Sequence, residues 1–389
     1  MHEEEEQRRH DAAFIHSRYR KAFLRHLSSM QRRLRQRRIP RASLLPPSHS
    51  AWKAICDSGN DQALITLTGV DFQTFNWYHE KFKMVYDSHS PFVDPNGFIV
   101  PIDPNFGGRP RLMTAADCLA LCLAWTRTRG SNMVLQIIFG MTGTPVSIYL
   151  RFGRRILIKV LKDEPDARIS IPGIEKIREY QAAINERHPN LENVWCCMDG
   201  LKLYLEEAGD ATTQNNYYNG WKQDHYVSSV FVFCPDGTIP ICCYNVPGSV
   251  HDSTVAEWGN VYQRLEKVYN LCGGRCTVDS AFLMKRYPFL VKSSDKNPFA
   301  ENPQDFLRCV EINAEVTSMR QSAEWGMHAI QSSFPRLKER FIYEERGERR
   351  IILKMMILLY NVRARRVGMN QIRNTYMAAL NVDADNMFT

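Results

Sequence analysis

The sequence predicts a mixed α+β or α/β protein in which a central sheet flanked by helices follows an all-helical region. Apolar runs typical of strands fall between about residues 194 and 280, and they alternate with turn signals and helical segments. Before residue 163, apolar residues recur at helical spacing behind capping residues. The chain has 389 residues, 44% hydrophobic and 24% charged, which is ordinary for globular domains and suggests two or three of them.

Residues 1–48 are predicted to form a basic N-terminal arm. The first 50 residues hold 12 Lys and Arg against 5 Asp and Glu, which accounts for +7 of the formal net charge of +8. The densest run is QRRLRQRRIPR, residues 31–41. Such a run is typical of a nuclear import signal or of a phosphate-binding arm, and a solvated helix face is the open alternative. We expect nuclear localisation.

Cysteine usage and the absence of long apolar runs indicate an intracellular protein with no membrane partner. No run approaches the ~20 apolar residues that span a bilayer, and MHEEEEQRRH is unlike a secretory signal. Eleven cysteines occur without a C-x-x-C motif, which favours reduced thiols packed as small apolar groups. Two pairs are weaker zinc candidates by spacing: Cys118 with Cys122, and Cys272 with Cys276.

Residues 49–110 are predicted to be a helical segment followed by a linker. DQALITLTG and DFQTFNWYHEKFKMVY read as short helices, and Asp71 is a candidate N-cap of the second. Residues 88–110, SHSPFVDPNGFIVPIDPNFGGRP, are rich in Pro, Gly and Asp and are predicted to be a loop.

Residues 111–164 are predicted to form a helix-turn-helix-like DNA-binding region of three helices. Thr114 is a candidate N-cap, and Gly130 and Gly140 are candidate helix stops. A short helix, a glycine turn and a longer basic helix are typical of this motif, although an ordinary three-helix packing unit is the alternative. The cations predicted to contact DNA are Arg127, Arg129, Arg151, Arg154, Arg155 and Lys159.

Residues 165–345 are predicted to form the sheet-containing domain, and residues 346–389 a helical tail. NVWCCMDG is read as a strand that ends at Asp199, and residues 225–248 as a hairpin around the turn Pro235–Thr238. A helix over about 249–270, a strand that ends at Asp279 and a helix that bears Glu324 complete the domain.

Asp199, Asp279 and Glu324 stand out because of the elements that carry them. The order of elements predicts an RNase H-like layout, in which the first and fourth strands lie side by side and a helix packs on the sheet. Three carboxylates brought together repel one another unless cations lie between them. Hard oxygen ligands suit two Mg²⁺ or Mn²⁺ ions, which support phosphodiester cleavage. Taken singly, each acid is equally well explained as a turn residue, a helix cap or a salt-bridge partner.

Residues of about 195–345 resemble the DDE nuclease domain of PIF/Harbinger transposases and of nucleases domesticated from them. The motifs that carry the resemblance are MDG at 198–200, PGSVHDS at 247–253, VDSAF at 278–282 and AEWGMHAIQSSFPRLKERF at 323–341. The tail NVRARRVGMNQI, 361–372, is also similar. Three positions depart from the family pattern: Val278 replaces a glycine, Phe282 a tyrosine and Trp325 a frequent arginine.

The resemblance implies that Asp199, Asp279 and Glu324 are the catalytic, metal-binding triad. Asp252 matches a recurrent aspartate of the family, for which a metal ligand, a supporting group and a helix cap all remain open. His251 is expected to be structural or to face DNA.

Supporting and DNA-binding roles are expected for cations around the predicted triad helix. Arg320 and His328 lie one helical turn on either side of Glu324, on the same face, and are expected to support it or hold a phosphate. Arg336 and Lys338 are expected to contact DNA phosphates.

The function that the resemblance implies is a DNA transposase. It cuts and joins transposon ends by two-metal hydrolysis and transesterification, acts on terminal inverted repeats and target DNA, and assembles as a dimer or a larger oligomer. A separate Myb/SANT-like DNA-binding partner is also implied. The alternatives are a domesticated Harbinger-derived nuclease and a non-catalytic DNA-binding or chromatin adaptor, and the intact set of acids argues against the adaptor.

Overall fold

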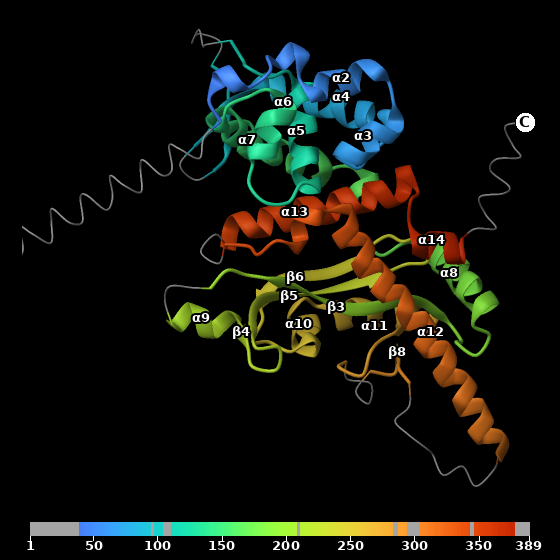
Figure 1. Cartoon of the computed structure of the whole chain (residues 1–389). Helices are drawn as coiled ribbons and strands as arrows, with labels where there is room; N and C mark the ends of the chain where they lie inside the picture. The colour runs from blue at the N-terminus through green and yellow to red at the C-terminus, as the bar shows by residue number, and fades with distance from the viewer. Residues whose placement is uncertain are drawn as a thin grey trace, which may run out of the picture. The chain divides into compact units, whose positions relative to one another are not determined.

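The computed structural model describes residues 39–94, 97–103, 110–207, 211–282, 287–293, 303–342 and 346–377 (Figure 1). These residues form two compact units, residues 39–54 with 131–147 and residues 55–130 with 148–377. Most of the predicted basic arm, including five of the six arginines in its densest run, lies outside the described residues, as does the end of the predicted tail.

The smaller unit contains a helix that ends at a closely packed glycine. It contains two 3₁₀ turns (η1, Arg41–Ser43; η2, Pro47–His49), helix α6 (Met133–Phe139) and the adjoining ends of α2 (Ala51–Ser58) and α7 (Gly143–Lys162). Gly140 ends α6 with φ +62°, as predicted. A Cβ at Gly140 would lie 2.4 Å from the Leu45 carbonyl oxygen, so both the backbone conformation and the close approach require glycine.

The helices before the sheet in the larger unit begin at the residues that the sequence predicts. They are α3 (Asp61–Thr68), α4 (Phe72–Ser88), α5 (Ala115–Arg127) and the rest of α7. Asp71 caps α4 by accepting a hydrogen bond of 2.7 Å from the Thr74 N–H. Thr114 and Asp117 form a reciprocal capping box at the start of α5, at 3.1 and 3.0 Å.

Buried thiols pack α5 against α7. A Cβ at Gly153 of α7 would lie 2.4 Å from the Cys122 Sγ and 2.8 Å from the Cys118 Sγ, so the two sulfurs fill the space that a side chain would need. All eleven cysteines are free thiols. Among the described residues, no group of three His, Cys, Asp or Glu is arranged to hold a metal. The thiols of α5 therefore act as packing groups.

The predicted linker contains a small hairpin, which corrects the expectation of a loop throughout residues 88–110. Strands β1 (His89–Val93) and β2 (Ile99–Pro101) pair in antiparallel fashion. Asp94 nucleates the turn, because its carboxylate accepts a hydrogen bond of 2.7 Å from the Phe98 N–H. Gly97 supplies the positive φ of +81° that the turn requires.

The larger unit holds a six-stranded mixed sheet within the described residues. Its central strand β3 pairs antiparallel with β5 and parallel with β7, and β7 pairs parallel with β8. Strands β4 and β6 both pair with β5. The predicted adjacency of the first and fourth strands, β3 and β7, is confirmed. The strands are β3 (Val194–Tyr204), β4 (Tyr218–Asn219), β5 (Asp224–Phe233), β6 (Ile241–Pro247), β7 (Arg275–Thr277) and β8 (Leu290–Val291).

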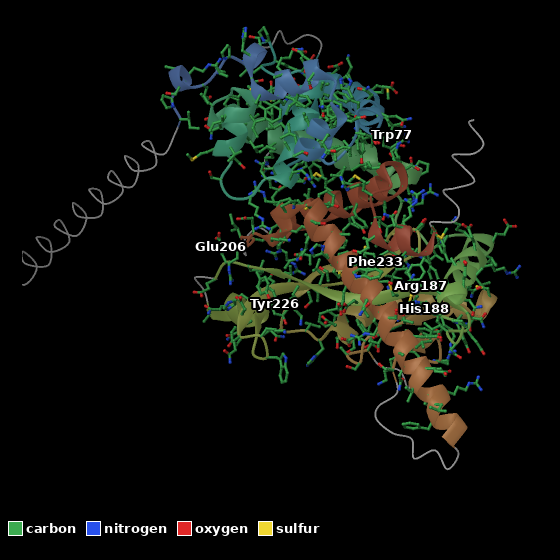
Figure 2. All side chains as sticks on the ribbon, turned by 45° about the vertical axis from the view of Figure 1, so that its right-hand side comes forward. Trp77, Arg187, His188, Glu206, Tyr226 and Phe233 are labelled. Atoms are coloured by element: carbon green, nitrogen blue, oxygen red, sulfur yellow. The ribbon has the colours of Figure 1, made fainter. Side chains whose placement is uncertain are left out.

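Helices flank the sheet, and a close contact at one glycine fixes the long helix α12. Figure 1 shows α13 on one side of the sheet, α10 and α11 on the other, and α12 running obliquely past β3. A Cβ at Gly326 of α12 would lie 2.7 Å from the Phe233 ring, and Tyr360 of α13 meets the same ring edge-on at 6.5 Å (Figure 2). Helices α12 and α13 therefore cover the same face of β5.

The remaining helices complete the larger unit. The α-helices are α8 (Ile174–Arg187), α9 (Ala211–Tyr217), α10 (Asp252–Trp258), α11 (Val261–Cys272), α12 (Pro303–Ser333), α13 (Arg346–Val362) and α14 (Gln371–Tyr376). Two 3₁₀ turns, η3 (Pro165–Ala167) and η4 (Pro335–Lys338), and a π-helical turn, η5 (Arg363–Val367), connect them.

In the described ranges no single helix is long and apolar enough to span a membrane; α6 and α7 pass that test only as a pair, which is bent by 93°.

Several sequence-based boundaries need correction. Strand β7 ends at Thr277, two residues before the predicted end at Asp279, and α5 ends at Arg127 and not at Gly130. Strand β3 continues past Asp199 to Tyr204, because β5 supplies pairing partners along this whole stretch. The predicted helix over 249–270 is two helices, since Gly259 and Asn260 separate α10 from α11 and Asn260 adopts φ +52°. Helix α12 begins at Pro303, well before the predicted segment.

Candidate active site

Parallel register places Asp199 and Asp279 side by side. Cys197 of β3 pairs with Thr277 of β7, and each aspartate lies two residues farther along its chain. Asp199 lies within β3, whereas β7 ends at Thr277, so Asp279 lies two residues beyond the end of its strand. The charge of Asp279 acts on Asp199, so the two carboxylates lie near each other. Asp199 accepts a hydrogen bond of 2.7 Å from the Gly200 N–H, and Asp279 accepts one from the Ala281 N–H. Both carboxylates are half-buried and held by local backbone donors.

The two carboxylates interact electrostatically. The pKa of Asp199 is raised from its ordinary 3.8 to about 6, mainly by burial; the Gly200 N–H opposes this shift and the neighbouring charge of Asp279 contributes to it. Proximity of like charges has this effect because ionisation of one carboxylate disfavours ionisation of the other. Burial and the charge of Asp279 therefore both oppose ionisation of Asp199.

Arg320 is the cation nearest to this pair that the structure shows. Its guanidinium Nη2 lies 3.6 Å from Asp279 Oδ2, and both side chains are about one-third exposed. The sequence predicted that Arg320 supports Glu324 or holds a phosphate, whereas the structure brings it to Asp279. A partly hydrated pair at this distance is weak, so the guanidinium remains available to a phosphate.

Glu324 lies on the exposed side of α12, one turn beyond Arg320, and His328 is exposed one turn later. Among the described residues, no three acidic, His or Cys side chains lie close enough together to hold a metal. The structure thus brings together two of the three predicted acids, and the assignment of Glu324 as the third stays a prediction.

The position of α12 is fixed from its buried side by the C-terminal helix. The Tyr376 hydroxyl of α14 lies 3.0 Å from the Ser322 hydroxyl and 3.1 Å from the Met319 sulfur. His188, at the end of α8, completes this buried network at 3.1 Å from the same hydroxyl (Figure 2). This anchor sets the helical turn that presents Arg320 and Glu324.

Asp252 approaches the pair from the opposite face of the sheet. A Cβ at Gly200 would lie 2.6 Å from Asp252 Oδ2, so the carboxylate occupies the space beside the glycine that follows Asp199. Burial raises the pKa of Asp252, Lys202 lowers it and Asp279 raises it. Asp252 is the first residue of α10, and His251 before it is exposed and makes no side-chain cap.

Part of the chain matches a known family. Residues 198–361 match the family model of the DDE superfamily endonuclease. The matched DDE segment begins beside Asp199 and includes Asp279, Asp252 and Glu324, and its mixed sheet flanked by helices is consistent with a DDE nuclease fold. No curated protein and no solved structure matches the chain significantly.

The donor set of the DDE segment fits a hard divalent cation. Asp199 and Asp279 present carboxylate oxygens from neighbouring segments of the chain, β3 and the residues after β7. Oxygen ligands of this kind suit Mg²⁺ and Mn²⁺. A cation between them would relieve the repulsion that contributes to the raised pKa of Asp199. These two aspartates are the residues that would hold the metal.

Metal affinity is expected to depend on the protonation of Asp199. Because its pKa in the folded protein, about 6, lies above the ordinary 3.8, the folded chain keeps a proton that the unfolded chain has lost. The stability of the metal-free protein therefore falls as pH rises from about 4 to about 6. Mn²⁺ affinity, measured by calorimetry, should rise about tenfold per pH unit below pH 6 and level off above it. A flat profile, or the same profile in Asp199→Asn, would contradict this.

Two cations predicted to contact DNA are held by protein contacts in the structure. Arg127 donates to the Ser333 carbonyl at 3.0 Å, and Arg155 forms an ion pair with Glu348. Arg154 of the predicted helix-turn-helix region is half-buried. The other cations predicted there to contact DNA are exposed, namely Arg129, Arg151 and Lys159. The Lys159 nitrogen lies 3.4 Å from a nitrogen of the His89 ring.

Arg154 and Arg336 both lie against the Trp125 ring. Each guanidinium carbon is 4.8 Å from the ring centroid. Arg336 also donates to the Gly130 carbonyl at 2.7 Å, whereas Lys338 is exposed. Sequence reasoning could not separate these two cations, because the aromatic partner of Arg336 lies more than 200 residues away.

Arg336→Ala is expected to lower the free energy of unfolding by about 1–3 kcal/mol, because it removes a cation–π contact and a carbonyl hydrogen bond. Lys338→Ala should change it by less than about 0.5 kcal/mol. Urea denaturation of both variants checks this. Equal stability of the two variants would show that the contacts of Arg336 contribute nothing.

Lys202 is a further charged residue near the site, and it was not predicted from the sequence. It lies on β3 two residues beyond Gly200, on the face that receives Asp252, and its charge lowers the pKa of that carboxyl. The signal was the period-two alternation of an extended strand, which became visible only once β3 was known to continue past Asp199.

Proposed function

We propose that the chain is a metal-dependent DNA transposase of the PIF/Harbinger type. The observation that carries the proposal is the proximity of Asp199, on β3, to Asp279, two residues beyond the end of the paired strand β7. Both lie inside the segment that matches DDE superfamily endonucleases. The motifs around both aspartates and the PGSVHDS element favour the Harbinger subtype.

In this mechanism Asp199 and Asp279 bind divalent cations through their ionised oxygens. Bound Mg²⁺ or Mn²⁺ ions supply activation of an attacking oxygen and stabilisation of a leaving oxygen in an in-line displacement. Arg320, beside Asp279, contacts a phosphate oxygen of the DNA and offsets its charge. Glu324 contributes the third carboxylate. Asp252 packs beside Gly200.

DNA ends and target DNA are the proposed substrates. The exposed cations Arg129, Arg151, Lys159 and Lys338 provide phosphate contacts that hold the duplex without reading its sequence. Assembly as a dimer or larger oligomer, a separate Myb/SANT-like partner and nuclear localisation complete the proposal.

A plasmid assay tests the proposed reaction. Supercoiled plasmid with candidate terminal inverted repeats is incubated with the full chain and Mg²⁺ or Mn²⁺, and a plasmid without repeats serves as the control. We expect cuts at the repeats and joining of the freed 3′ ends to target DNA. Metal-dependent cuts without joining would support a domesticated nuclease instead.

A non-catalytic DNA-binding adaptor is the second candidate. Two observations favour it: no three-acid group is assembled among the described residues, and Arg320 already lies close to Asp279. Tight DNA binding without any cleavage, in the presence of the partner protein, would select this function.

A further inference from the structure

A cavity with a basic lining lies apart from the carboxylate pair. Its volume is about 350 Å³, and it is formed by the start of β3, by β7, by the end of β8 and by the first part of α12. Three cations line it: Arg275, Lys292 and Arg308. Apolar residues, Val194 and Ile312 among them, also line it. This volume is at the lower end of the range for ligand sites.

Among the described residues, the cations of this cavity have few acidic partners. Glu192 is the only acid among the lining residues. Within the described residues, Lys292 and Arg308 make no hydrogen bond or ion pair, and Arg275 uses one N–H on the Pro288 carbonyl at 3.4 Å. Like charges gathered without partners repel one another, and an anionic ligand relieves that repulsion.

The cavity shares its elements with the carboxylate pair. Lys292 directly follows Val291, which pairs with Thr277, and Thr277 lies two residues before Asp279. Arg308 lies on the same helix as Arg320, twelve residues earlier, which is about 18 Å along the axis. That length corresponds to about five base pairs of duplex DNA.

We propose that Arg275, Lys292 and Arg308 bind a backbone phosphate of the substrate DNA, about five base pairs from the bond that is cut. The identity of the ligand as DNA rests on the proposed function. Lysine and arginine side chains recognise the phosphodiester charge, while the apolar lining residues accommodate the adjoining sugar. This contact fixes the register of the strand relative to Asp199 and Asp279.

The test compares two double variants of the full chain. Lys292→Ala/Arg308→Ala removes two cavity charges, and Arg178→Ala/Lys267→Ala removes two exposed charges on α8 and α11. Affinity for a fluorescent 30-base-pair duplex is measured by anisotropy, without metal, over a range of salt concentrations. We expect the cavity variant to bind about tenfold more weakly and its log K against log salt slope to fall by about 0.9 for one lost phosphate. The control variant should differ less in both quantities.

Ethylation interference locates the phosphate. Ethylation about five base pairs from the nick should weaken binding of the wild type and have no further effect on the cavity variant. Wild-type affinity and slope in a folded cavity variant would overturn the proposal. A competition experiment gives a second contradicting result. If inorganic phosphate binds the wild type and the duplex does not displace it, the cavity binds a free anion and the proposal is overturned.

The two hypotheses fail separately. If the wild type never cuts DNA but the cavity variant loses affinity and slope, the phosphate contact in the cavity stands, its stated distance from a cut bond is withdrawn, and the nuclease proposal fails. If the wild type cuts with metal and the cavity variant binds like the wild type, only the cavity proposal fails.

Discussion

Asp279→Asn is expected to lower metal-dependent nicking of supercoiled plasmid by more than about a hundredfold, with DNA affinity unchanged. Asparagine keeps an oxygen that can accept the Ala281 N–H, so the local turn is preserved. The variant removes the negative charge that would hold the cation and that faces Arg320 at 3.6 Å. Loss of groups that merely orient metal ligands already costs about 10–100-fold, and loss of a ligand costs more.

Glu266→Gln is the matched control for this variant. Glu266 is an exposed acid on α11, so its replacement removes one negative charge without touching the carboxylate pair. The control should nick DNA at the wild-type rate. Equal nicking by Asp279→Asn and the wild type would remove Asp279 from the active site.

The second large effect is expected at Gly326, where alanine should lower the free energy of unfolding by about 1–3 kcal/mol. A glycine-to-alanine change inside a helix normally stabilises by about 0.5–1 kcal/mol, so the sign is reversed here. The reversal follows from packing, because the added Cβ would lie 2.7 Å from the Phe233 ring. Nicking should fall as well, since displacement of α12 moves Arg320 and Glu324.

Gly347→Ala provides the comparison for Gly326→Ala. Gly347 lies near the start of α13, and no atom of the described residues comes within 4 Å of the position that a Cβ would take there. Alanine should therefore be neutral or stabilising at this position. Urea denaturation of both variants measures the difference. Similar stability of the two variants would show that the contact with Phe233 relaxes at no cost.

Local chemistry made part of this fold predictable. The caps at Asp71 and Thr114 and the stop at Gly140 depend on neighbouring residues alone, and all three are present. Adjacency of the strands that carry Asp199 and Asp279 followed from element order and from the family resemblance. The β3–β7 register that brings Asp279 near Asp199, and the end of β7 at Thr277, were known only from the structure.

Long-range contacts account for what the sequence did not predict. Asp199 lies within β3 because β5 extends the pairing to Tyr204. No sequence pattern before Tyr204 indicates that β5 pairs there. Strands β4 and β8 have two residues each, too few to show a period. Arg127 looked like a DNA contact, yet it binds carbonyl groups about 205 residues away. The distance of Glu324 from the aspartates likewise depends on how α12 crosses the sheet.

Iron-mediated cleavage of the polypeptide tests the central claim most directly, namely that Asp199 and Asp279 hold a divalent cation together. Fe²⁺ replaces Mg²⁺ in the full chain, ascorbate and peroxide generate radicals at the bound ion, and mass spectrometry maps the backbone cuts. We expect cuts close to residues 199 and 279, lost in Asp199→Asn and suppressed by excess Mg²⁺. Additional cuts near 324 or 252 would identify the further ligand. Cuts that avoid both aspartates, or that persist unchanged in Asp199→Asn, would contradict the claim.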